Sequence, residues 1–151
     1  MLRNKSFLNK SMDFLVLYFQ CYFLNSREEL NLWGNHLKGT IPSELGLLDS
    51  LTNLNFSWNE LTGSIPSELG SLLNLKEFEL YNNRLNGIIP SEIGKMKMLE
   101  VLYLNRNKLE GSIPTELFLC KTINQLWLFM NKLTGAIPTF IGQLEILEIR
   151  K

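Results

Sequence analysis

The stretch NELTGSIPSELGSL, from Asn59 to Leu72, returns 24 residues later as NRLNGIIPSEIGKM, from Asn83 to Met96. Both copies hold an asparagine, a leucine two residues on, a glycine, an Ile-Pro pair and a second glycine at the same places. Self-similarity at a fixed period of this length is typical of proteins built from stacked repeats. The 24-residue unit therefore decides the fold.

The unit can be followed through most of the chain. Five full repeats of 24 residues begin at Arg27, Leu51, Leu75, Leu99 and Ile123, and a truncated sixth begins at Leu147. We expect residues 27–151 to form the repeat domain and residues 1–26 to form a leader. The leader has basic residues ahead of an apolar stretch, which favours a signal peptide, but its aromatic residues would equally suit a makeshift N-terminal cap.

Composition excludes several classes of function. The 151 residues include 15 basic and 15 acidic side chains, and this balance argues against a nucleic-acid partner. The longest apolar stretch, Phe14 to Leu24, is too short for a membrane span, so we expect no span in this chain. Its two cysteines and single histidine lack the spacing of a metal site, and Asp13 and Asp49 are its only aspartates. We therefore expect no metal, no cofactor, no catalytic residue and no enzyme.

The first half of each repeat reads as a short strand. Apolar residues alternate with polar or aromatic ones, and one strand per repeat can bury its apolar face only by stacking on its neighbours. The expected inward residues are the fourth and sixth of each repeat: Leu30 and Leu32, Leu54 and Phe56, Phe78 and Leu80, Leu102 and Leu104, Leu126 and Leu128. Cys120 stands where other repeats carry leucine or methionine, which predicts a small buried hydrophobic residue.

The ninth position of every full repeat is asparagine. An amide side chain both donates and accepts hydrogen bonds, so it can satisfy backbone groups of its own loop and of the neighbouring loop. An inward leucine follows two residues later, which argues against a plain surface turn. We therefore predict an internal asparagine ladder formed by Asn35, Asn59, Asn83, Asn107 and Asn131.

The second half of each repeat reads as the return path. A glycine that suits positive φ, such as Gly63, is followed by an Ile-Pro pair that keeps the chain extended. The next residue stands where a helix N-cap belongs, with glutamate in the first turn of four repeats and a glycine close behind. Any helix is then a single turn, of 3₁₀ type. The expected N-caps are Ser43, Ser67, Ser91, Thr115 and Thr139.

The pattern LxxLxLxxNxLxGxIPxxLGxL resembles the leucine-rich repeat, and its G-x-I-P segment resembles the plant-type extracellular subclass of receptor-like kinases and receptor-like proteins. The resemblance covers about residues 27–149. It implies an α/β fold: a right-handed solenoid, or horseshoe arc, with a concave parallel β-sheet and short convex 3₁₀ turns. It also implies an extracellular or cell-surface protein that binds peptides, small hormones or partner proteins through the concave face or its edge.

The chain departs from the family pattern at both ends. The paired-cysteine cap before the first repeat and the closing cap after the last are missing, and Arg150 stands where an inward leucine should be. The chain also carries no kinase motif. It resembles a fragment of a receptor-like kinase or receptor-like protein ectodomain, or a short secreted member of the family with poor caps.

The candidate binding site lies on strand residues that the core does not use. These outward positions hold all three tryptophans of the chain, and exposed aromatic residues on one face supply much of the binding energy in protein interfaces. The alternative is that strands favour aromatic residues in any case. The predicted ligand-binding residues of the concave face are Trp33, Trp58, Tyr81, Tyr103, Arg106, Trp127 and Phe129.

Two further features bear on this face. Acidic residues precede basic ones along the stack, which would orient a partner with one basic and one acidic end, although ordinary solubilising charge explains the pattern equally well. Asn55 begins the sequon Asn55-Phe56-Ser57 at an outward position, and a glycan there would move the binding surface toward the last three repeats.

The leading functional hypothesis is a non-catalytic recognition module from a receptor ectodomain in cell-surface signalling or defence. Its expected partners are a peptide or protein ligand and a co-receptor. The alternatives are a secreted leucine-rich repeat inhibitor of a pathogen hydrolase, and a truncated remnant without independent function.

Overall fold

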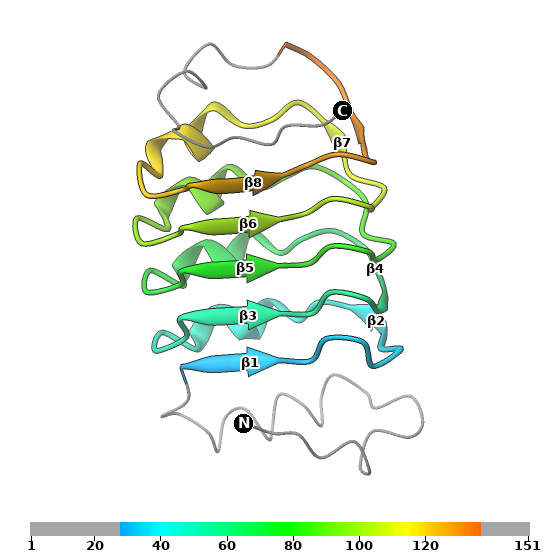
Figure 1. Ribbon diagram of the computed structural model, residues 1–151, viewed down its shortest axis with the longest axis horizontal. Helices are drawn as coiled ribbons and strands as arrows, with labels where there is room; N and C mark the ends of the chain where they lie inside the picture. The colour runs from blue at the N-terminus through cyan, green and yellow to red at the C-terminus, as the bar shows by residue number, and fades with distance from the viewer. Residues whose placement is uncertain (1–27, 137–151) are drawn as a thin grey trace.

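The computed structural model describes residues 28–136. The expected leader, the truncated sixth repeat and the expected N-cap Thr139 lie outside these residues. Figure 1 shows the repeats stacked one on another, with one strand of each facing the viewer and the helical turns behind.

The main sheet is parallel and takes one strand from each of the five repeats. Its strands are β1 (Glu29–Asn31), β3 (Asn53–Asn55), β5 (Glu77–Glu79), β6 (Val101–Tyr103) and β8 (Gln125–Trp127), in that order across the sheet. The register pairs equivalent residues, so that Leu30 lies opposite Leu54 and Leu54 opposite Phe78. Each position of the repeat therefore forms a row along the stack.

The return path begins with a second set of short strands. β2 (Lys38–Thr40) pairs in parallel with β4 (Glu60–Thr62), and β7 (Glu110–Gly111) pairs with β9 (Lys132–Leu133). This pairing was not expected from the sequence. The turn glycines do take positive φ as predicted, including Gly63 at 76°.

The 3₁₀ turns confirm the predicted helical type. They are η1 (Ser43–Leu47), η2 (Ser67–Ser71), η3 (Ser91–Lys95) and η4 (Thr115–Leu119). The expected N-caps are wrong, because Ser43, Ser67, Ser91 and Thr115 are the first residues inside these turns. The preceding prolines stand at the caps in an extended conformation, and they close each first turn through their carbonyl oxygens, as in the 3.3 Å bond from Leu45 N to Pro42 O.

The core runs along the inside of the stack, between the sheet and the 3₁₀ turns. The predicted inward residues from Leu54 to Leu128 are all buried, and Leu30 and Leu32 of the first repeat are partly buried against them. Cys120 is fully buried, as predicted. Burial raises the pKa of its thiol, while the charge of Lys97 acts in the opposite direction.

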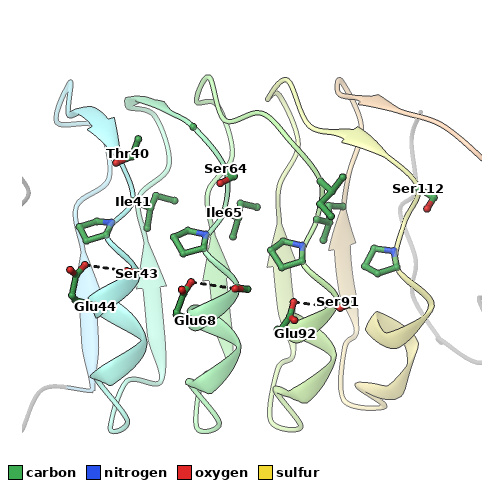
Figure 2. A pocket seen from close by; sticks show the side chains of 18 residues that line it. Thr40, Ile41, Ser43, Glu44, Ser64, Ile65, Glu68, Ser91, Glu92 and Ser112 are labelled. Carbon is green, nitrogen blue, oxygen red and sulfur yellow. Dashed lines mark hydrogen bonds between the residues drawn. The ribbon is translucent and has the colours of Figure 1, made fainter.

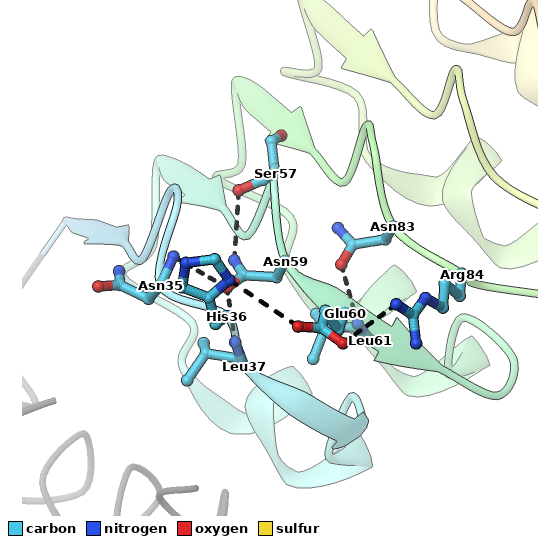
Figure 3. Close-up of polar contacts among 9 residues, drawn as sticks. All are labelled: Asn35, His36, Leu37, Ser57, Asn59, Glu60, Leu61, Asn83 and Arg84. Atoms are coloured by element: carbon cyan, nitrogen blue, oxygen red, sulfur yellow. Dashed lines mark hydrogen bonds and ion pairs between the residues drawn. The ribbon is translucent and has the colours of Figure 1, made fainter. Parts of the chain in front are cut away.

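The ninth-position asparagines link each repeat to the one before it. From Asn59 onward, each Oδ1 accepts the backbone N–H of a leucine in the preceding repeat, and each Nδ2 donates to a carbonyl of that repeat. Figure 3 shows the first two of the Oδ1 links. The Oδ1 bonds are Leu37 N to Asn59 at 2.9 Å, and Leu61 N to Asn83, Leu85 N to Asn107 and Leu109 N to Asn131, each at 3.0 Å. Asn35, in the first described repeat, donates instead to the Trp33 carbonyl.

Candidate functional site

The candidate site lies on the outward side of the main sheet, which we call the sheet face. Side chains at the third, fifth and seventh positions of each repeat reach this face, because successive residues of a strand point to opposite sides. The parallel register then brings fifth-position Tyr103 directly opposite Trp127 on the next strand.

The structure brings five of the seven predicted residues into one continuous group. The Trp33 indole N–H donates to the Tyr81 hydroxyl at 3.3 Å, and the Tyr81 and Tyr103 rings meet edge to face with centroids 6.2 Å apart. Tyr103 stacks on Trp127 at 4.1 Å, and Trp127 lies 6.1 Å from Phe129. We call Trp33, Tyr81, Tyr103, Trp127 and Phe129 the aromatic band.

Trp58 and Arg106 lie outside the band, at the eighth position of their repeats. Their φ angles are 57° and 56°, in the left-handed region that side chains other than glycine seldom adopt. The same conformation recurs at Gly34, Asn82 and Met130, so it belongs to the repeat and not to one residue. The left-handed conformation was not predicted from the sequence, although glycine and asparagine, which adopt it more readily than other residues, stand at two of these positions. Trp58 is left 51% exposed.

An ion pair lies at the end of the sheet face where the strands finish. Arg84 Nη2 lies 3.1 Å from Glu60 Oε2, and the exposed His36 side chain lies 3.8 Å from the other oxygen of the same carboxylate (Figure 3). These residues share the tenth position of the first three repeats. Lys108 and Lys132 hold that position in the fourth and fifth repeats.

The third repeat carries two carboxylates on its main-sheet strand. Glu77 and Glu79 are the first and last residues of β5. Burial raises the pKa of Glu79, and the neighbouring charge of Glu77 raises it further, while a hydrogen bond with the Asn55 side chain acts against both. This part of the face therefore disfavours additional negative charge.

Asn55 holds an outward position on β3, but it is nearly buried there. Its residue is only 8% exposed, and its Oδ1 accepts the Ser57 backbone N–H at 3.0 Å. A glycan on Asn55 would have to pull the side chain away from Ser57 and Glu79. Glycosylation of the sequon stays a prediction.

Buried polar atoms lie beneath this face, and sequence reasoning did not find them. Ser57 and Asn105 occupy the seventh position, where the first, third and fifth repeats carry members of the aromatic band, and they are 0% and 3% exposed. Ser57 Oγ and Asn105 Oδ1 have no hydrogen-bond partner. Aromatic and small polar residues therefore alternate along this row.

A groove lies on the flank of the described part of the chain. It has a volume of about 970 Å³ and runs past the Ile-Pro segments of four successive repeats. In it the hydroxyls of Ser43, Ser67 and Ser91 each donate to the carboxylate of the next residue, as from Ser43 to Glu44 at 3.4 Å (Figure 2). Its lining residues include no aromatic and no basic side chain. Anchors of the kind that dominate protein interfaces therefore lie on the sheet face and not in the groove.

Within residues 28–136, no three His, Cys, Asp or Glu side chains are grouped so that they could hold a metal ion. No helix in this range is long and apolar enough to cross a membrane.

Comparison with known proteins agrees with this architecture. The profile of the Leucine Rich Repeat family matches residues 28–48, 50–72, 74–96 and 98–120. No curated protein matches the chain. Among solved structures, a chain of the BIR3–SERK2 complex from Arabidopsis thaliana is 38% identical with a TM-score of 0.72, and the match covers 80% of this chain and 66% of that one.

Chains from two further structures are also similar. A chain in the complex of the Arabidopsis receptor kinase HAESA with the peptide hormone IDA and the co-receptor SERK1 is 38% identical, with a TM-score of 0.82 over 87% of this chain. A chain in the PEPR1–AtPEP1 structure is 42% identical, with a TM-score of 0.79 over 83% of this chain. The matches span 22% and 18% of those two chains.

Proposed function

The chain belongs to the leucine-rich repeat family, and from this premise we propose that it binds an extended peptide or protein segment across its sheet face. In this proposal it acts outside the cell or at the cell surface, as part of a signalling or defence receptor. It performs no catalysis itself.

The observation that carries the proposal is the aromatic band. Rings from the first, third, fourth and fifth repeats form one chain of contacts on a rigid sheet, so their conformational entropy is largely lost before any ligand arrives. Preorganisation of this kind lowers the cost of binding. Tyrosine and tryptophan also dominate the energetics of protein interfaces.

Similar structures support a peptide ligand. The HAESA structure is described as a complex with a peptide hormone and a co-receptor, and the PEPR1 structure carries AtPEP1. The main-sheet strands lie about 4.8 Å apart, so the third to fifth repeats offer roughly 10 Å along the stack. That length suits several residues of an extended chain.

The test is a peptide-library screen followed by substitution. Trp127→Ala and Tyr103→Ala should each weaken a selected peptide by at least about 1 kcal/mol, because they remove stacked members of the band. Glu92→Ala, on the 3₁₀ side, is the control and should leave affinity unchanged. If Glu92→Ala weakens peptide binding and the two aromatic variants do not, the ligand binds elsewhere.

A further inference from the structure

Acidic and basic side chains hold different positions of the repeats on the sheet face. Glu77 is the first residue of β5, and Glu79 lies in the same row as Tyr103 and Trp127 of the aromatic band. Where the strands have ended stand four basic residues at the eighth and tenth positions. They are Arg84, Arg106, Lys108 and Lys132.

Backbone hydrogen bonds fix the basic residues along one edge. The N–H groups of Lys108 and Lys132 donate at 2.7 Å to Leu85 and Leu109, which are equivalent residues of the preceding repeats. Arg106 N–H donates to the Phe129 carbonyl at 3.0 Å, which places Arg106 beside the last member of the aromatic band. The row therefore follows the band through the fourth and fifth repeats.

Most of this row has no negative partner. Glu60 neutralises Arg84 at 3.1 Å, but no carboxylate of residues 28–136 forms an ion pair with Arg106, Lys108 or Lys132. All three side chains are exposed. We call Arg106, Lys108 and Lys132 the cationic edge.

We propose that the ligand of the sheet face is an extended peptide with acidic side chains at alternate positions, which it directs to the cationic edge. The inference rests on the proposed function and adds the chemical class of the ligand. Alternate side chains of an extended peptide point to opposite sides, so one set faces the cationic edge while the other faces Glu77 and Glu79. The second set must therefore be neutral or basic, since like charges there would repel.

The spacing is compatible with this arrangement. Alternate residues of an extended peptide are about 6.7 Å apart, and neighbouring repeats about 4.8 Å. Lysine and arginine side chains are long and rotatable enough to absorb this difference. The exposed cations also attract a negative ligand before contact, which raises the association rate more than the final affinity.

The experiment uses three capped ten-residue peptides in which tyrosine alternates with glutamate, glutamine or lysine. Titration calorimetry of the full chain at low salt should show the glutamate peptide binding at least about tenfold more tightly than the glutamine peptide, and the lysine peptide most weakly. Raising the salt concentration should reduce the differences in affinity among the three peptides, because exposed charges are screened.

Charge reversal then locates the effect. Lys108→Glu and Lys132→Glu should each remove the preference for the glutamate peptide, whereas Lys95→Glu, an exposed lysine in η3, should retain it. Unchanged thermal unfolding temperatures will show that the variants are folded, and Lys132→Gln should give an intermediate loss.

The outcomes separate the two proposals. Equal binding of all three peptides, lost in Trp127→Ala, would leave the sheet face as the binding surface and overturn the acidic preference. Tightest binding of the lysine peptide would also overturn it, by showing that Glu77 and Glu79 dominate. Failure of every peptide to bind would count against both.

Discussion

The indole of Trp33 and the hydroxyl of Tyr81 are joined by a 3.3 Å hydrogen bond although 48 residues separate them. Both hold the seventh position, in the first and third repeats, and Ser57 holds it in the repeat between. With strands about 4.8 Å apart, the two side chains reach across one whole repeat to meet. Ser57, placed between them, is fully buried. The aromatic band thus covers a polar residue at this point.

Replacing Ser57 by alanine should stabilise the protein. Its Oγ is buried without a hydrogen-bond partner, and such a group costs about 1–3 kcal/mol in lost hydration. We expect Ser57→Ala to raise the free energy of unfolding by about 1 kcal/mol, measured by urea denaturation. The exposed Ser64→Ala is the control. A clear loss of stability in Ser57→Ala would mean that the hydroxyl has a partner.

Replacing Asn83 by alanine should destabilise the stack. Its side chain accepts from Leu61 N at 3.0 Å and donates to the carbonyls of Phe56 and Leu80 at 2.9 and 3.1 Å. The substitution leaves three backbone groups without these bonds, so we expect a loss of at least about 2 kcal/mol. Thermal unfolding is the measurement, and the exposed Lys76→Ala is the control. Equal unfolding temperatures for the two variants would show that Asn83 does not hold the repeats together.

Replacing Gly94 by alanine should separate two 3₁₀ turns. A Cβ on Gly94 would lie 2.2 Å from the carbonyl oxygen of Glu116, a backbone atom that cannot move aside alone. Gly39 is the matched comparison, because its added Cβ meets nothing within 4 Å and only its φ of 94° resists substitution. We expect Gly39→Ala to lose roughly 1–2 kcal/mol of unfolding free energy and Gly94→Ala clearly more. A Gly94→Ala variant as stable as Gly39→Ala would contradict the close stacking of η3 and η4.

The sequence predicts this fold well because every repeat carries apolar residues at the same positions. The fourth and sixth residues of a repeat must be apolar to fill the core, and the structure buries Phe78 and Leu80 as expected. The N-cap prediction failed at Ser43 because local preference for a capping serine does not distinguish the residue before a turn from its first residue. Extended proline, fixed near φ −65°, already closes the turn.

The site was harder to predict, because contacts between side chains depend on backbone conformations that the pattern leaves open. Spacing alone identified Tyr103 and Trp127 as neighbours on adjacent strands. It also treated Trp58 as an equal member of the group, although its left-handed backbone sets it apart from the band. The outward strand position of Asn55 likewise does not reveal that its Oδ1 accepts the Ser57 backbone N–H, a bond that holds the side chain close to the sheet.

The last prediction concerns the pH dependence of stability at Glu79. Burial, reinforced by Glu77, raises the pKa of this carboxyl, so the folded protein holds its proton more tightly than the unfolded chain. Stability must then fall as the pH rises from the ordinary pKa of glutamate through the raised value. In acid the carboxyl is protonated, and the cost of burying its charge disappears.

Glu79→Gln carries no charge at any pH and should escape this loss. Its unfolding temperature relative to the original chain should increase between about pH 4 and pH 7, whatever constant offset the lost hydrogen bond with Asn55 introduces. Differential scanning calorimetry across this range measures the difference, and the exposed Glu110→Gln is the control. If the difference in unfolding temperature between Glu79→Gln and the original chain stays constant over this pH range, the carboxyl titrates alike in the folded and unfolded states.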